Sequence, residues 1–324
     1  MKTRLFFSLL FSASFSSIVW GAPAERLVIG AEGRKGIAIV DPAKNNEVLW
    51  HETTGPVHDL HLLPNLNLLS QDGWTKIVEF SLSGERVWTY DASLKNREET
   101  DGKIEIHAFQ RLPGGYTMIA ESGTARLIEI DITGKITKKF PFSLDEKHHH
   151  SDTRLVRKLE NGHYLVAHEN NQRVKEYDSE GKVVWDFGIP LFGTKPKKGH
   201  GPDAFGGKCF AAIKAANGNY LITTGNGHSV LEVTPEKEIV WKLSQGDLEG
   251  ITLAWVTTIE ERPGGTLIIG NCHAGPENPQ IIELTRDKEV VWTFRDFDTF
   301  GNALSNSLVV DGEPALQIRE RLSQ

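Results

Sequence analysis

The feature that most constrains this chain is an internal repeat that occurs six times along it. Five copies begin near residues 63, 112, 159, 215 and 262, and a shortened copy occupies 27–50. Each copy holds short alternating or apolar runs separated by Asn-Gly, Gly-Gly or Ser-Gly turns, which is typical of consecutive antiparallel strands. No helical period of useful length competes with this pattern. The sequence therefore predicts an all-β fold.

The spacing of the repeats predicts the architecture. The aromatic residues that close the copies are Trp50, Trp88, Phe140, Trp185, Trp241 and Trp292. Their average interval of about 48 residues is the length of one four-stranded propeller blade. The first copy lacks an opening strand, whereas residues 302–313 read as an opening strand with no blade after it. If the two pair, the ring closes with no free edge. We therefore predict a single six-bladed β-propeller over residues 25–324, with seven blades as the main alternative.

The first 24 residues are predicted to be a signal peptide. The chain begins MKTR, continues with the apolar run FFSLLFSASFSSIV and reaches small residues at GAPA, which is the order of a secretory signal. The apolar run is shorter than the roughly 20 residues that span a bilayer, and no other segment is a candidate. The mature protein is expected to be secreted or periplasmic, without membrane insertion.

Charge and cysteine content exclude two classes of protein. The chain has 36 basic and 43 acidic residues, interspersed along its length, and a formal net charge of −7. This balance gives no basic surface for nucleic acid. Two cysteines, Cys209 and Cys272, are too few for a disulfide scaffold. Whether they pair with each other stays open, because spacing alone does not decide it.

Most of the histidines are expected at one end of the ring. In such a propeller, the connections from one blade to the next emerge on one face, and here they are long, at 91–104, 141–150, 188–208 and 244–254. The turns on the opposite face are short. Functional residues usually lie on variable loops held by a rigid scaffold. The face with the long loops is therefore the predicted working face.

Alignment of the blades on their first turn predicts a polar arc near the mouth of the central channel. Residues seven positions before the turn and seven positions after it are approximate cross-strand neighbours. The predicted pairs are His58 with Asp72, His107 with Glu121, and Arg154 with His168.

The run EKHHHSDTR at 146–154 enters the fourth blade on the same face. Imidazoles beside carboxylates serve as general bases or as metal ligands. The candidate catalytic residues are His58, His107, His150 and His228. The candidate ligand-binding residues are Asp72, Glu121, Asp152, Arg154, His168, His200, Lys208, Asn226, Trp255, Asn271 and His273. For each residue a structural hydrogen bond or a solvated loop is the competing interpretation. A bound metal ion also stays open, although no HExxH motif supports one.

The strand–turn–strand phrases DITGKITKKF, DSEGKVVWDF and TRDKEVVWTF resemble the repeats of the PQQ-like, quinoprotein-type propellers. More loosely, they resemble the propeller of bacterial aryl sulfotransferases. The resemblance covers nearly the whole mature chain, but its motifs are structural: the Trp or Phe is similar to the residue that docks one blade on its neighbour. PQQ is not expected, because the quinone enzymes hold it with adjacent cysteines and a calcium site, and Cys209 and Cys272 are far apart. No stretch matches a sulfotransferase catalytic motif.

Two functions remain open from the sequence. In the first, an exported propeller binds a small anionic or glycan-like ligand at a histidine-rich channel mouth, with enzymatic activity by acid/base or metal-assisted chemistry. In the second, a non-catalytic scaffold uses the same face to bind an envelope protein. The fold alone does not choose between them.

Overall fold

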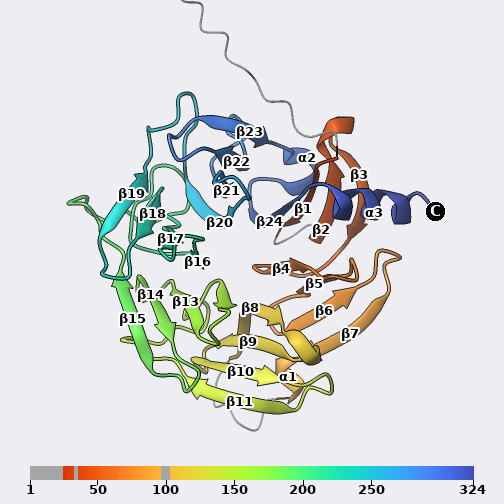
Figure 1. Ribbon diagram of the computed structural model, residues 1–324, viewed down its shortest axis with the longest axis horizontal. Helices are drawn as coiled ribbons and strands as arrows, with labels where there is room; N and C mark the ends of the chain where they lie inside the picture. The colour runs from red at the N-terminus through yellow and green to blue at the C-terminus, as the bar shows by residue number, and fades with distance from the viewer. Residues whose placement is uncertain (1–24, 33–35, 96–102) are drawn as a thin grey trace, which may run out of the picture.

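Six four-stranded antiparallel sheets form a ring around a central axis (Figure 1). This computed structural model describes residues 25–32, 36–95 and 103–324, so the predicted signal peptide lies outside the described residues. The predicted six-bladed β-propeller is confirmed. Among the described residues, no helix is long and apolar enough to cross a membrane.

The blades follow one another along the chain, and each runs from the axis outward. Their strands are β24 (Leu304–Val310), β1 (Leu27–Glu32), β2 (Gly36–Asp41) and β3 (Glu47–Glu52) in blade 1; β4 (Leu60–Leu62), β5 (Leu68–Gln71), β6 (Lys76–Phe80) and β7 (Arg86–Asp91) in blade 2; β8 (Glu105–Arg111), β9 (Thr117–Ser122), β10 (Arg126–Ile130) and β11 (Ile136–Pro141) in blade 3; β12 (Val156–Lys158), β13 (Tyr164–His168), β14 (Arg173–Tyr177) and β15 (Val183–Gly188) in blade 4; β16 (Ala211–Lys214), β17 (Tyr220–Thr223), β18 (Val230–Val233) and β19 (Ile239–Leu243) in blade 5; and β20 (Trp255–Glu261), β21 (Leu267–Cys272), β22 (Ile281–Leu284) and β23 (Val290–Phe294) in blade 6. The short helices are η1 (Pro42–Lys44), α1 (Ala92–Lys95), η3 (Pro113–Gly115), α2 (Phe297–Phe300) and α3 (Glu313–Leu322).

The ring closes as predicted, by pairing of the two ends of the described chain. Strand β24 pairs antiparallel with β1, with Leu27 opposite Val310, so β1 has a partner on each side and blade 1 has its four strands. Helix α3 then buries Ala315 and Ile318 in the same apolar cluster as Leu27. Closure therefore ties residues from both ends of the sequence into one core.

Outer-strand tryptophans dock blades 2, 4 and 5 on the blade that follows each of them. The indole Nε1 of Trp88, Trp185 and Trp241 donates a hydrogen bond to a carbonyl oxygen in the neighbouring blade, at Ile132, Pro235 and Arg286 respectively. The docking role that the resemblance implied for these residues is therefore observed.

Blade 3 needs a correction to the predicted alignment. Trp88 lies opposite Glu79, and the residue in the corresponding position of blade 3 is Lys138, opposite Glu129. Phe140 sits two residues further along, where its ring packs so closely against Gly181 that a Cβ there would lie 2.5 Å from it. Gly181 also has a φ of +83°, so both the backbone and the neighbour require glycine.

The two cysteines do not form a disulfide in the described structure, and both are buried thiols. Cys209 donates a hydrogen bond to the carbonyl oxygen of Arg173 at 3.3 Å, and Cys272 lies against the carbonyl oxygen of Asn302 at 3.9 Å. The sequence left open whether these two cysteines pair with each other, and in the structure they do not.

Candidate functional site

The inner strands are irregular at the same level in several blades, and this irregularity creates the site. In blade 3 the register of β8 and β9 shifts between Ile106 and Ala108, so His107 is a bulged residue. In blades 2, 4 and 5 the inner strand begins only after His58, Arg154 and Phe210. Bulges and late strand starts re-aim side chains that a regular ladder would hold in the sheet.

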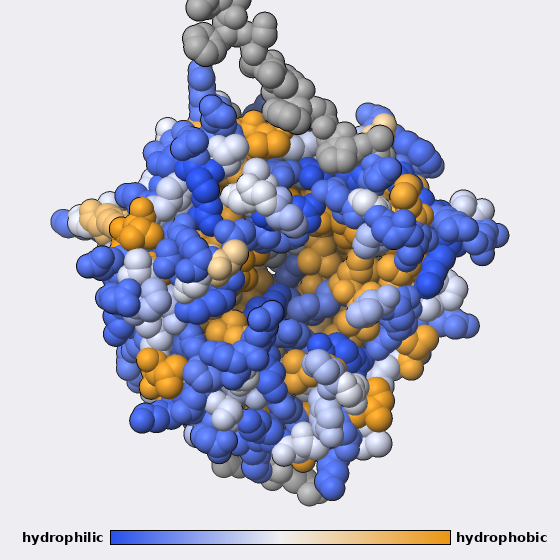
Figure 2. All heavy atoms as spheres, in the orientation of Figure 1, coloured by the Kyte–Doolittle hydropathy of each residue, from blue (hydrophilic) through white to orange (hydrophobic). Residues whose placement is uncertain are grey.

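These re-aimed residues surround a cavity of about 110 Å³ at the axis, where the space-filling view shows the molecule hollowed (Figure 2). Five blades each contribute one residue from the corresponding position of the inner strand: His58, Arg154, Phe210, Thr257 and Ser305. The remaining lining residues come from loops and strand ends: His150, His200, Trp255, Cys272 and His273. The predicted convergence of distant segments at one channel mouth is therefore present in the structure.

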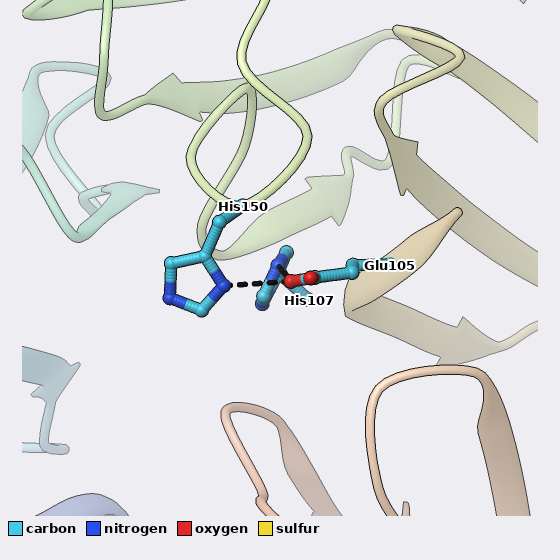
Figure 3. A group of neighbouring side chains, drawn as sticks. All are labelled: Glu105, His107 and His150. Carbon is cyan, nitrogen blue, oxygen red and sulfur yellow. Dashed lines mark hydrogen bonds and ion pairs between the residues drawn. The ribbon is translucent and has the colours of Figure 1, made fainter. Parts of the chain in front are cut away.

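A histidine cluster, defined here as His58, Glu105, His107 and His150, reaches this cavity through His58 and His150, which line it. The Oε2 atom of Glu105 lies 3.1 Å from His107 Nε2 and 2.6 Å from His150 Nδ1 (Figure 3). The other nitrogen of His107, Nδ1, lies 2.7 Å from Nδ1 of His58. The ring of Trp74 packs 4.9–5.2 Å from all three imidazole rings. Glu105 thus joins two imidazoles directly and a third through His107.

Burial keeps two of these imidazoles neutral. Desolvation lowers the pKa of His107 to about 3, against the opposing effect of Glu105. Desolvation, together with the nearby Arg154 charge, holds the pKa of His58 well below its usual range. Although burial opposes it, the hydrogen bonds from His107 and His150 hold the pKa of Glu105 below its usual range. The cluster therefore combines an ionised carboxylate with neutral imidazoles, whose lone pairs can accept a proton or bind a metal.

Arg154 and Trp255 bring positive charge and an aromatic surface to the same cavity. Glu169 is buried between two cations: its Oε2 lies 2.5 Å from Arg154 Nε and its Oε1 lies 2.8 Å from Lys208 Nζ. Lys208 also lies 5.8 Å from the centre of the Trp255 ring, which packs 4.7 Å from the ring of His200. Two cations sharing one carboxylate leave an excess of positive charge on this side of the cavity.

The carboxylates and the guanidinium of the predicted cross-strand pairs form ion pairs with other residues, and two members of these pairs, His58 and His107, are in the histidine cluster. Asp72 pairs with Arg86 at 2.6 Å and Glu121 pairs with Arg126 at 2.6 Å. Arg154 pairs with Glu169, not with His168. The bulge at His107 and the late start of β4 and β12 shift the inner-strand side chains out of the regular ladder, so regular cross-strand geometry no longer gives their neighbours.

Several other candidate residues have their polar atoms bonded to the protein away from the cavity. His168 lies between the carbonyl oxygen of Asp152 and the hydroxyl of Tyr177, at 2.8 Å from each. His228 lies between the carbonyl oxygens of Ala204 and Ala254. The remaining members of this group hold loops through backbone hydrogen bonds: Asp152 with Gly123 and His148, Asn226 with Lys208, and Asn271 with Ala254 and Thr252. This geometry favours structural roles for them.

Glu105, Trp74 and Glu169 belong to the site but were not among the residues predicted from the sequence. Glu105 had one local signal, since it stands two residues before His107 in an Glu-x-His sequence. Trp74 lies in the turn after β5. Its carbonyl oxygen accepts a hydrogen bond from Ile106 N at 2.7 Å. Only this contact between blades brings the indole to the histidines, and no sequence pattern indicates it.

Comparison with known proteins agrees with the fold. A structure of a protein of unknown function from Bacteroides caccae has a TM-score of 0.71 at 20% identity, over 88% of this chain and 98% of that chain. A catalytically inactive histidine-to-alanine variant of virginiamycin B lyase from Staphylococcus aureus, solved with quinupristin, has a TM-score of 0.55 at 13% identity, over 85% of this chain and 87% of that chain. A streptogramin B lyase structure has a TM-score of 0.55 at 12% identity, over 86% of this chain and 85% of that chain. At these identities the likeness concerns the fold.

The sequence comparison is more specific. No curated protein matches the chain. The family model described as "Arylsulfotransferase (ASST)" matches residues 25–189, which cover blades 1–4 from their first described strand through β15 and include the histidine cluster. Because the match spans more than half of the sequence, the chain belongs to the arylsulfotransferase (ASST) family.

Proposed function

We propose that this protein is an exported enzyme that binds a small anionic aryl ester at the channel mouth and transfers its sulfuryl group to an acceptor hydroxyl. The observation that carries the proposal is the convergence of several imidazoles and the Arg154 guanidinium on a single cavity, with Lys208 joined to Arg154 through Glu169. Convergent polar groups in a cavity are the usual sign of a ligand site. Membership of the arylsulfotransferase family supports the reaction class, and the signal-like residues 1–24 support export.

The cavity walls suit the two parts of such a substrate. Arg154 and Lys208 lie on the cationic side, where they attract a sulfate group, and a guanidinium can hold two of its oxygens at once. Trp255 and Phe210 line the same cavity and offer an apolar surface to an aromatic ring. An anion with one aromatic ring would therefore find a charged and an apolar partner within one small volume.

The hydrogen-bond chain from Glu105 gives His58 its proposed role. When Glu105 accepts from His107 Nε2–H, the Nδ1 atom of His107 carries a lone pair and accepts from His58 Nδ1–H at 2.7 Å. His58 lines the cavity. This arrangement leaves its Nε2 lone pair to act as a base. A carboxylate that orients an imidazole in this way fixes its tautomer. Here the effect passes through His107.

In the proposed reaction, His58 Nε2 takes the proton of the acceptor hydroxyl as that oxygen forms a bond to sulfur. The bond from sulfur to the donor aryl oxygen breaks, and its electron pair stays on that oxygen as a phenolate. Phenols have a pKa of about 10, so this group leaves without an acid, and it later receives the proton held by His58. Arg154 stabilises the charge on the sulfuryl oxygens in the transition state.

A transfer assay tests this proposal. The purified protein is incubated with an aryl sulfate donor and a phenol acceptor, and the released phenol and the sulfated acceptor are both measured. We expect turnover by the wild type and a loss of about 10²–10⁴-fold in kcat for His58→Ala and for the closer isostere His58→Gln. His163→Gln is the matched control, because His163 also bonds to a glutamate, Glu176 at 2.6 Å, outside the cavity.

Two results would contradict the proposal. One is a folded wild-type protein that releases no phenol from any aryl sulfate tested. The other is full activity in both His58 variants. If the folded protein is inactive but binds an envelope protein through the same face, the scaffold interpretation replaces the enzyme.

A further inference from the structure

We infer that Glu105, His107 and His150 form a binding site for one divalent transition-metal ion, for which Zn²⁺ is the best fit. One carboxylate oxygen and two imidazole nitrogens, each on a different residue, lie within 4.8 Å of one another. All three point to a common place between β8 and the loop that enters blade 4 (Figure 3). The inference stands on this geometry and does not depend on which reaction the cavity supports.

The donor set selects the class of metal. Mg²⁺ and Ca²⁺ prefer oxygen ligands, whereas two imidazoles with one carboxylate suit Zn²⁺ and other first-row divalent ions. Sites with three protein ligands keep a further position for water or substrate. His150 lines the cavity, so that further position would face the place proposed for the substrate.

The surroundings of His107 fit a metal ligand. A histidine that binds a metal through one nitrogen almost always donates its other N–H to a fixed acceptor. Here Nε2 faces Glu105 and Nδ1 lies 2.7 Å from His58 Nδ1, so in a metal-bound form His107 would donate to a neutral His58 while its Nε2 lone pair binds the metal. In that form His58 Nε2 carries the hydrogen, so the base role proposed for His58 belongs to the metal-free protein. Without a metal, the same atoms satisfy each other through N–H donors to Glu105. His107 is fully buried, which holds its ring in this orientation.

A cation at this place would change the charge of the cavity. Around the cavity, the charges of Arg154 and Lys208 are offset by those of Glu169 and Glu105. A divalent cation beside Glu105 would leave the cavity with a net positive charge, which would attract an anionic ligand. This last step rests on the proposed function, whereas the metal site itself does not.

Metal analysis of the intact protein tests the inference. After treatment with a chelator and removal of that chelator, Zn²⁺ is titrated by calorimetry, and the bound metal is counted by elemental analysis after dialysis. We expect one Zn²⁺ per chain for the wild type and at least a tenfold loss of affinity for Glu105→Gln and for His150→Ala. His58→Ala removes the partner of a metal ligand, so its loss is expected at about 10–100-fold.

Controls separate this site from other histidines. His163→Gln should keep one Zn²⁺ per chain, because the His163 and Glu176 pair has a single imidazole. The double variant His148→Ala/His149→Ala should keep it too, because both residues are exposed and outside the cluster. Wild-type protein that retains no Zn²⁺, or a metal that is lost in this double variant but kept in His150→Ala, would overturn the inference. Thermal melts of each variant verify that it is folded.

The same samples separate the two proposals. Metal-free protein that transfers sulfuryl groups and takes up no Zn²⁺ would remove the metal site and leave the proposed function standing. Protein that binds one Zn²⁺ through these residues but turns over no aryl sulfate in either the metal-free or the zinc-bound form would do the reverse.

Discussion

Two groups of histidines lie on this face of the propeller, and they differ in what their nitrogens contact. The cavity histidines, His58, His107 and His150, bond to one another or to Glu105. The anchoring histidines, His168 and His228, have both ring nitrogens against backbone carbonyl oxygens or a tyrosine hydroxyl. The first group keeps titratable partners beside a cavity, whereas the second fixes loops. Residue type and position in the fold are alike in both groups, so the partners decide the role.

The largest expected effect separates the groups by stability. His168→Ala removes a fully buried ring and leaves the Asp152 carbonyl without this hydrogen bond, so we expect the free energy of unfolding to fall by about 3–4 kcal/mol. His150→Ala, whose side chain is 40% exposed, should cost less than about 1 kcal/mol. Denaturant unfolding followed by tryptophan fluorescence measures both. Equal losses in the two variants would contradict the division into groups.

The second effect concerns the pH dependence of stability, and it involves one histidine from each group. Burial lowers the pKa of both His107 and His168 to about 3, whereas an unfolded histidine titrates near 6.5. Between these values the unfolded chain binds protons that the folded protein does not, so stability falls as the pH drops from about 6.5 towards 3. Each histidine contributes a slope of up to about 1.4 kcal/mol per pH unit.

His168→Gln sharpens this prediction, because glutamine does not titrate. We expect a shallower decrease of unfolding free energy between pH 6.5 and pH 4 than in the wild type, whatever the stability of the variant at pH 8. The measurement is a series of denaturant curves across this range. An unchanged slope would mean that the folded protein protonates His168 readily.

The architecture was accessible from the sequence because it depends on periodic features. Six repeats, their turns and the unpaired segment at 302–313 predicted both the blade number and the closing strand, since apolar alternation and turn residues are local properties. The positions aligned with His58, Arg154 and Phe210 were also correctly assigned to one level of the channel, and Ser305 at the same distance from its turn completes them in blade 1. Repeated sequence segments can be aligned with one another, and the alignment assigns each residue to a level and a face of the propeller.

Contacts between blades could not be predicted in the same way. The segments 225–228 and 270–273 read GNGH and GNCH and end in histidines with positive φ, His228 and His273. Yet His273 lines the cavity, while His228 is held between two loops. The difference comes from the neighbouring loops, which have no common pattern. For the same reason Glu105 was overlooked: its partners are set by a one-residue bulge and by a loop 45 residues away.

The smallest expected effects lie within the run of three consecutive histidines. Here exposed histidines stand directly beside the cavity residue His150 in the sequence. His148 Nδ1 lies 2.8 Å from the hydroxyl of Ser151 and accepts from His150 N at 3.3 Å, so His148→Ala should cost about 0.5–1 kcal/mol by removing these hydrogen bonds from an exposed side chain. His149 is exposed and stacks only on His148, with ring centres 5.2 Å apart, so His149→Ala should change stability by less than about 0.5 kcal/mol. Neither should alter turnover, because neither lines the cavity. Unfolding curves and the transfer assay on both variants measure this, and a loss of turnover in His149→Ala would place the active groups on the loop surface instead of in the channel.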